Sequence, residues 1–208
     1  MHAGSLNLTL TSPPQSFTEP LTVAEVEQFL RLPDLSPKDD DRDDLLEALI
    51  TAAREVAEIE QRRDLVEKQW DLSLDWWRYP IPLRAPLVSV DLVQYTDSAG
   101  TETTLTENTD YVVDTAKHPG IICPPYGGIW PSFTPWPSSP ILIRFTSGLS
   151  ATDIFWSDAG QRVLLGMKML IAHWYNQGDL MAPPGSMGGE IPWGAKVLLG
   201  TGAVPAGR

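Results

Sequence analysis

The spacing of apolar side chains changes twice along the chain. Between residues 21 and 65 apolar positions recur with the period of an amphipathic helix. Over residues 66–150 they alternate with polar positions or form short runs between turns, as strands do. Helical spacing returns over residues 151–180, and a Gly- and Pro-rich tail covers residues 181–208. This order predicts an α+β fold: a small helical bundle, with two N-terminal helices and one long C-terminal helix, carries an inserted antiparallel β-sheet region.

Two helices are expected between residues 21 and 65. In LTVAEVEQFLRL, Thr22 precedes the apolar positions and Glu25 follows three residues later, which is the pattern of a capping box. In SPKDDDRDDLLEALITAAREVAEIEQRR, Ser36 is the predicted N-cap and Pro37 the first helical residue. Apolar positions form one stripe of this second helix, so that stripe should lie against a core. The opposite, polar face is expected to carry Glu47, Arg54, Glu55 and Glu58.

Aspartates at the start of the second helix alternate as in a calcium-binding EF-hand loop. The alternating residues are Asp39, Asp41 and Asp43. An EF-hand loop also needs Gly at its sixth position and Glu at its twelfth, where this chain has Asp44 and Ile50. We therefore interpret the cluster as a solvated helix start, where the helix dipole favours carboxylates, and expect no metal there.

Short strands separated by turns occupy the middle of the chain. The expected strands are residues 66–74, 87–95, 103–105, 111–113, 121–123 and 141–145. Because no helix separates them, they should form an antiparallel sheet rather than βαβ units. A turn at Asp97-Ser98-Ala99-Gly100 should join the second and third strands.

A long Pro- and Trp-rich loop is expected over residues 119–140, PGIICPPYGGIWPSFTPWPSSP. Prolines and glycines exclude a regular helix there, and the aromatic side chains supply adhesive surface. Long ordered loops are usually functional, so this loop is a candidate contact surface. The rival interpretation is a proline-rich ligand for SH3 or WW domains at residues 137–140, but no basic residue flanks it.

The last long helix is predicted within QRVLLGMKMLIAHWYNQGD and should end near Gln177, with Gly178 as its cap. This helix is apolar around nearly its whole girth, so it needs cover on more than one side. His173 lies beside Trp174 and Tyr175. Because nothing nearby completes a catalytic set, we interpret His173 as a hydrogen-bonded interior or interface residue.

The two ends of the chain differ in character. Residues 1–20 carry three prolines and no sustained period, which predicts a flexible N-terminal arm. The tail over residues 181–208 contains a compact apolar cluster that could form one or two helical turns. Such a cluster usually docks, either onto its own domain or onto a neighbour.

Composition narrows the classes of protein. The 208 residues suffice for one domain with an insertion, and a single folded unit is expected. The net charge of −12 argues against gripping nucleic acid through its phosphates, although an acidic wall would suit a conduit through which DNA passes. Solubility alone is the plainer explanation of that charge. No secretory signal or membrane-spanning run is evident, so a cytosolic location is expected, and one cysteine excludes an intrachain disulfide.

Recognisable catalytic motifs are missing from the sequence. We find no G-x-S-x-G elbow, P-loop, G-x-G-x-x-G or H-E-x-x-H, and only three histidines. We therefore expect no catalytic residues, no metal and no cofactor. An enzyme without a recognised motif stays open as an alternative. So does a ligand-binding module that stacks a sugar or a base on Trp76, Trp77, Trp130 and Trp136.

The order of several segments resembles a known family. LTVAEVEQFLRL is followed by DDLLEALITAAREVAEIEQRR, then by KQWDLSLD, by PLVSVDLVQY with its Asp-x-x-Gly turn, and by DYVVD. A strand ending in Phe145-Thr-Ser-Gly148 leads into the LLIAHWY-type helix. In this order, over residues 21–180, the chain resembles the head–tail connector, or adaptor, proteins of long-tailed bacteriophages and phage-like particles.

This resemblance implies a structural role. About twelve copies would form a ring beneath the portal, extend the DNA channel and give stopper or tail proteins a platform. The implied partners are the portal protein, stopper or tail proteins and further copies of the chain, with DNA passing through the lumen without sequence-specific binding and no membrane involved. The implied location is the virion neck, between capsid and tail, after assembly in the host cytoplasm. Another neck component, such as a stopper or tail-completion protein, is the alternative.

The resemblance also implies contact residues. The C-terminal segment of relatives reaches the portal, so the candidate portal-docking residues are Ile191, Trp193, Val197, Leu198 and Leu199. Contacts that close a ring use two different patches of each chain. The candidate subunit or tail contacts are Tyr126, Trp130, Phe133, Trp136, His173 and Trp174.

Overall fold

The computed structural model describes residues 7–10, 18–33, 40–157, 159–177, 191–200 and 202–204. The chain divides into two compact units, where its length predicts one. The β unit comprises residues 1–17, 66–149 and 205–208, and the helical unit comprises residues 18–65 and 150–204. Helices and antiparallel sheets together confirm the α+β class.

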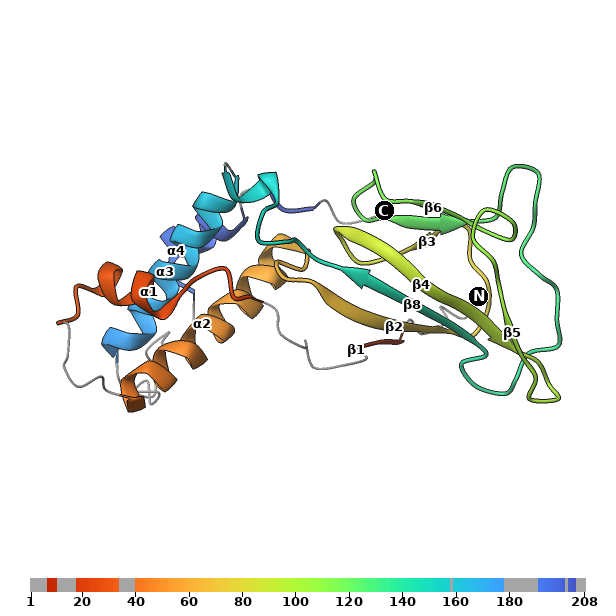
Figure 1. The fold of residues 1–208 in the computed structure, drawn as a ribbon, viewed down its shortest axis with the longest axis horizontal. Helices are drawn as coiled ribbons and strands as arrows, with labels where there is room; N and C mark the ends of the chain where they lie inside the picture. The colour runs from red at the N-terminus through yellow and green to blue at the C-terminus, as the bar shows by residue number, and fades with distance from the viewer. Residues whose placement is uncertain are drawn as a thin grey trace. The chain divides into compact units, whose positions relative to one another are not determined.

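Four α-helices and one 3-10 helix are described in the helical unit (Figure 1). They are α1 (Val23–Leu30), α2 (Asp40–Gln61), η1 (Ile154–Ser157), α3 (Ala159–Gln177) and α4 (Trp193–Gly200). Helix α3 packs against α1, α2, α4 and η1, and α2 also contacts α4. The need of α3 for cover on several sides, expected from its apolar girth, is thus met at least partly within the helical unit. Helix α4, with eight residues or about two turns, confirms the one or two helical turns predicted in the tail.

The start of α1 confirms the predicted capping box. The Thr22 hydroxyl accepts a hydrogen bond from the Glu25 N–H at 3.3 Å, and the Glu25 carboxylate accepts one from the Thr22 N–H at 2.9 Å. The latter hydrogen bond is the main reason that the pKa of Glu25 lies below its usual range. The predicted caps Ser36 and Gly178 and the helix start Pro37 lie outside the described residues.

The polar face predicted for α2 is wrong at two positions. Arg54 and Glu58 are both buried, with 3% of their surface exposed. The guanidinium of Arg54 contacts carboxylate oxygens of Glu19 at 3.0 Å and Glu58 at 3.1 Å. Because the two charges compensate each other, polar residues can occupy a helix face that is covered by protein.

Two antiparallel sheets form the β unit. The strands are β1 (Asn7–Leu10), β2 (Lys68–Leu74), β3 (Ile81–Pro82), β4 (Leu87–Thr96), β5 (Glu102–Thr104), β6 (Val112–Asp114), β7 (Ile121–Cys123) and β8 (Ile141–Ser147). The larger sheet has the order β1-β2-β8-β4-β5 and the smaller one the order β3-β7-β6. The predicted turn joins β4 to β5, and its Gly100 N–H donates to the Asp97 carbonyl at 2.9 Å.

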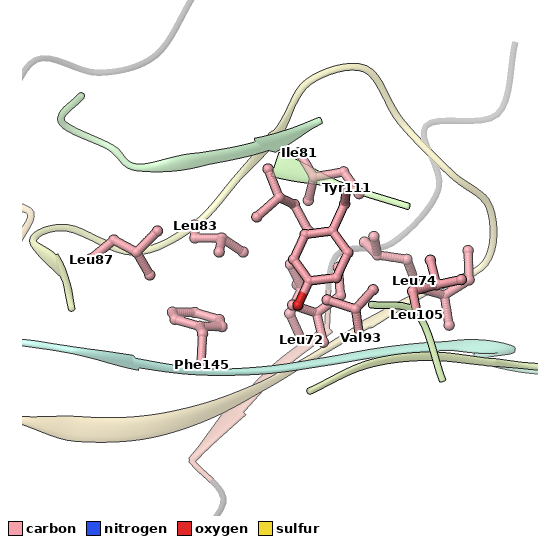
Figure 2. Close-up of a cluster of buried hydrophobic side chains, with 12 residues drawn as sticks. Leu72, Leu74, Ile81, Leu83, Leu87, Val93, Leu105, Tyr111 and Phe145 are labelled. Atoms are coloured by element: carbon pink, nitrogen blue, oxygen red, sulfur yellow. The ribbon is translucent and has the colours of Figure 1, made fainter. Parts of the chain in front are cut away.

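The core of the β unit lies between these sheets (Figure 2). Strand β8 alternates buried and half-buried positions, so Ile141, Ile143 and Phe145 all face the core. From the other side Ile81 and Tyr111 point toward the larger sheet (Figure 2). Burial raises the pKa of Tyr111 above its usual value.

The flexible arm predicted over residues 1–20 does not hold at Asn7–Leu10, which form β1. This strand pairs with the edge of β2, where Leu8 lies opposite Leu72 and Leu10 opposite Trp70. Four residues of alternating polarity are too few to predict a strand from the sequence, and β1 is ordered by its pairing with β2. Residues 1–6 and 11–17 lie outside the described part of the chain.

Candidate interaction surfaces

The aromatic loop over residues 119–140 contains an anchor that is packed inside the β unit. The Trp130 ring stacks on Trp77, with centroids 4.5 Å apart and planes 8° apart, and its Nε1 donates to the Arg78 carbonyl at 2.7 Å. The Phe133 ring lies 4.3 Å from that of Tyr95. Trp130 and Phe133 were predicted as contact residues, but in this structure their rings pack within the β unit and hold the loop in place.

The same loop presents an exposed tip. The Gly128 N–H donates to the Pro125 carbonyl at 2.8 Å, and Gly127 between them adopts a φ of +74° that favours glycine. This tight turn leaves Tyr126 fully exposed, at 108%, and Ile129 at 86%. The exposure of Tyr126 is compatible with the predicted contact role, which stays a prediction. Ile129 is not among the predicted contact residues, because aromatic composition alone indicated the contact surface.

A hollow of about 270 Å³ adjoins this tip. Its lining residues are Thr109, Asp110, Pro125, Gly128, Ile129, Trp130, Pro131 and Ser132. One lining residue is charged, Asp110, whose carboxylate accepts a hydrogen bond from the Thr106 N–H at 2.8 Å. The hollow thus lies directly beside the exposed Ile129 of the tip.

The four tryptophans that were considered as a stacking platform for a ligand do not form one continuous exposed surface in the structure. Trp77 and Trp130 stack on each other, so each covers a ring face that a sugar or a base would need. Trp76 and Trp136 are partly exposed, at 48% and 45%. This arrangement weakens the ligand-binding interpretation, because the closest aromatic pair is already satisfied.

The predicted portal-docking residues differ in their exposure to solvent. Trp193 and Val197 are exposed, at 81% and 46%, whereas Leu199 is fully buried. Leu199 packs on α3 at Gly166, where an added Cβ would lie 2.9 Å from the Leu199 Cδ2. In this structure Leu199 therefore holds α4 on its own unit. Ile191 and Leu198 are half-buried.

The residues after α4 are held by the C-terminal end of α2. The Val204 N–H donates to the Gln61 carbonyl at 2.9 Å, and the Gln61 side-chain amide donates to the Leu199 carbonyl. The Arg63 guanidinium donates to the Gly202 carbonyl at 2.6 Å and lies over the Phe155 ring. Burial lowers the pKa of Arg63. The described part of the tail, residues 191–200 and 202–204, thus contacts its own helical unit.

His173 and Trp174 are half-buried on α3.

No group of three or more His, Cys, Asp and Glu side chains in the described part of the chain is placed to hold a metal ion. Among the described helices, none has the length and apolarity needed to cross a membrane.

One acidic face of α2 forms a shallow groove of about 490 Å³. Its lining residues are Asp44, Glu47, Ala48, Thr51, Ala52 and Glu55. The three carboxylates repel other anions, and the small residues between them leave the groove open. Glu47 and Glu55, both predicted on the polar face of this helix, are among its lining residues.

Comparisons with known proteins place the fold. No family model and no curated protein matches the sequence. A chain in the neck of an empty gene transfer agent particle, computed with C6 symmetry, shares the fold with a TM-score of 0.67, 23% identity and 97% of both chains covered. A chain of the native gene transfer agent virion gives 0.69, 22% and 97% of both chains. A chain in the native neck with C12 symmetry gives 0.66, 23% and 97% of both.

Proposed function

We propose that this chain is a structural component of the neck of a phage or phage-like particle, with no catalytic role. The observation that supports this most is the fold shared over 97% of both chains with chains from gene transfer agent necks. Coverage at that level includes both units, so the likeness is not limited to a common small motif. Because fold alone does not define function, the proposal also rests on the exposed aromatic and acidic surfaces of the chain.

Within the neck, we assign the chain the role of adaptor, in a ring of about twelve copies beneath the portal. The order of the segments that resemble adaptor proteins supports this role. In addition, one of the gene transfer agent necks that contain a chain of similar fold was computed with C12 symmetry. Its partners are then the portal, stopper or tail proteins and further copies of the chain. The acidic face of α2 suits a channel wall, because it repels the DNA backbone and offers it no binding site.

The exposed residues of α4, Trp193 and Val197, are assigned to the portal together with Ile191. The loop tip with Tyr126 and Ile129, and the exposed Trp136, are assigned to a neighbouring subunit or a tail protein. Exposed aromatic side chains on ordered backbone are typical of residues that dominate binding at interfaces. A stopper or tail-completion protein remains the alternative, and it would use the same surfaces on different partners.

The portal assignment is tested with the full-length chain and the portal ring of the same particle. We expect rings on the portal in negative-stain images. The double variant Trp193→Ala/Val197→Ser should weaken portal binding at least about tenfold, because hot-spot truncations lose roughly 2 kcal/mol or more. Ile59→Ser, at a position 72% exposed on α2, is the matched control and should bind normally. A portal that binds no wild-type chain would contradict the adaptor role.

A further inference from the structure

Strand β1 is one of the two edge strands of the larger sheet. Its register with β2 pairs Leu8 with Leu72 and Leu10 with Trp70, so both leucines face the core side of the larger sheet. They stay 39% and 38% exposed, which leaves room for additional cover in an assembly. Strand β1 makes no comparable contact with another described element. Strand β1 is thus held by its backbone hydrogen bonds to β2 and by the packing of Leu8 and Leu10.

Strand β2 is a ready acceptor for such a strand. In the order β1-β2-β8-β4-β5, the side of β2 away from β8 is filled by β1 alone. Without β1, the edge of Lys68–Leu74 would expose a row of N–H and C=O groups, which pairs readily with any added strand. The ladder consists of backbone hydrogen bonds, so β2 can accept β1 from its own chain or from an identical chain.

The chain path connects β1 to the helical unit rather than to the strand it pairs with. After Leu10 the chain enters the helical unit at Thr18, builds α1 and α2, and returns to β2 only at Lys68. The entry point is fixed, because the Glu19 carboxylate contacts Arg54 Nε at 3.0 Å. From Leu10 to Thr18 the chain spans at most about 28 Å. The same span allows β1 to pair with β2 of a neighbouring copy, provided that this β2 lies within that distance of Thr18.

We propose that in the assembled ring β1 of each copy pairs with β2 of the adjacent copy. This inference rests on the proposed ring. Each chain contributes an arm and an edge, two different patches whose head-to-tail contact can close a circle. Exchange of an identical element keeps every β1–β2 contact and adds a connection between copies. A strand of four residues is weak alone, but the high local concentration in a ring favours its pairing.

The test uses three full-length variants in a Cys123→Ser background, which removes the native thiol. Asn7 and Ser73 lie opposite each other on β1 and β2, and Ser73 and Leu142 lie opposite each other on β2 and β8. Rings are assembled on the portal from equal mixtures of Asn7→Cys with Ser73→Cys, or of Ser73→Cys with Leu142→Cys. A short thiol-to-thiol crosslinker is added, and the products are separated on a denaturing gel.

Exchange predicts covalent dimers from the Asn7→Cys and Ser73→Cys mixture, because each chain carries only one of the two thiols. The Ser73→Cys and Leu142→Cys mixture should stay monomeric, since β2 pairs with β8 inside the β unit. Intact rings that give no dimers from the first mixture overturn exchange and leave the proposed neck function standing. If the wild-type chain forms no rings on the portal, the proposed function and the exchange both fail.

Discussion

At the residue scale, the clearest determinant of the helical unit is Arg54. Its guanidinium contacts the carboxylates of Glu19 and Glu58, and Glu58 also accepts a hydrogen bond from the Leu65 N–H at 3.0 Å. The cluster therefore connects the segment before α1, the body of α2 and the segment after it. Side chains exposed by only 3% make these contacts sensitive to the loss of one partner.

Arg54→Met should destabilise the helical unit by about 3–5 kcal/mol, because it removes the guanidinium that contacts the buried Glu58 carboxylate. Urea unfolding followed by circular dichroism measures the loss. The double variant Arg54→Met/Glu58→Met should recover much of it, and Glu55→Gln, on the exposed face of α2, should change stability by less than about 0.5 kcal/mol. Equal losses in the single and double variants would contradict a compensating pair.

Sequence patterns place Arg54 wrongly because they count charge as exposure, and burial of a paired charge depends on contacts far along the chain. Gly148 is a residue whose position in the sequence was noticed but whose structural reason could not be predicted. It ends a segment that resembles the adaptor family, yet its reason appears only in the structure. Its φ is +133°, and an added Cβ would lie 2.1 Å from the Val66 carbonyl oxygen. Only glycine fits so close to that backbone.

At the element scale, the contact between α3 and α4 determines where the tail lies. Gly166 on α3 allows Leu198 and Leu199 of α4 to approach closely, with an added Cβ 3.2 Å from the Leu198 Cβ. This is why an isolated glycine occurs in the middle of a long apolar helix, where it otherwise lowers helix stability by about 1 kcal/mol relative to alanine.

Gly166→Leu should displace α4 from α3, since overpacking of a close contact costs about 1–3 kcal/mol. Hydrogen exchange of the amides in Trp193–Gly200 should then accelerate by roughly 5- to 150-fold, while exchange in the middle of α2 changes little. Gly200→Ala, where nothing lies within 4 Å of the added Cβ, is the control. Unchanged protection of α4 in Gly166→Leu would refute the close contact.

Elements with a sustained period could be predicted, and short ones could not. The helices α2 and α3 and the strands β2 and β8 show their period over enough residues to identify them. Strand β3 has two residues and β1 has four, so pairing with a partner strand rather than local pattern orders them. Likewise, the aromatic loop was recognised by composition, but only its packing separates the anchor Trp130 from the exposed Tyr126.

At the scale of the whole molecule, two compact units each carry surface suited to assembly. The β unit presents an exposed loop tip and an edge strand, and the helical unit presents an acidic face and the exposed side of α4. A chain with a net charge of −12 can border a DNA path without binding it, since phosphate contacts need clustered Lys and Arg. These features, with the shared fold, are the basis on which we propose a structural role in the neck.

The most direct test of this role is a cryo-EM reconstruction of the neck of the particle that carries this chain. We predict density for the chain as a closed ring of about twelve copies in direct contact with the portal, surrounding the DNA path. Trp193 should lie against the portal, and the loop tip with Tyr126 against a neighbouring copy or a tail protein. A reconstruction in which the neck contains no copy of the chain would contradict the account.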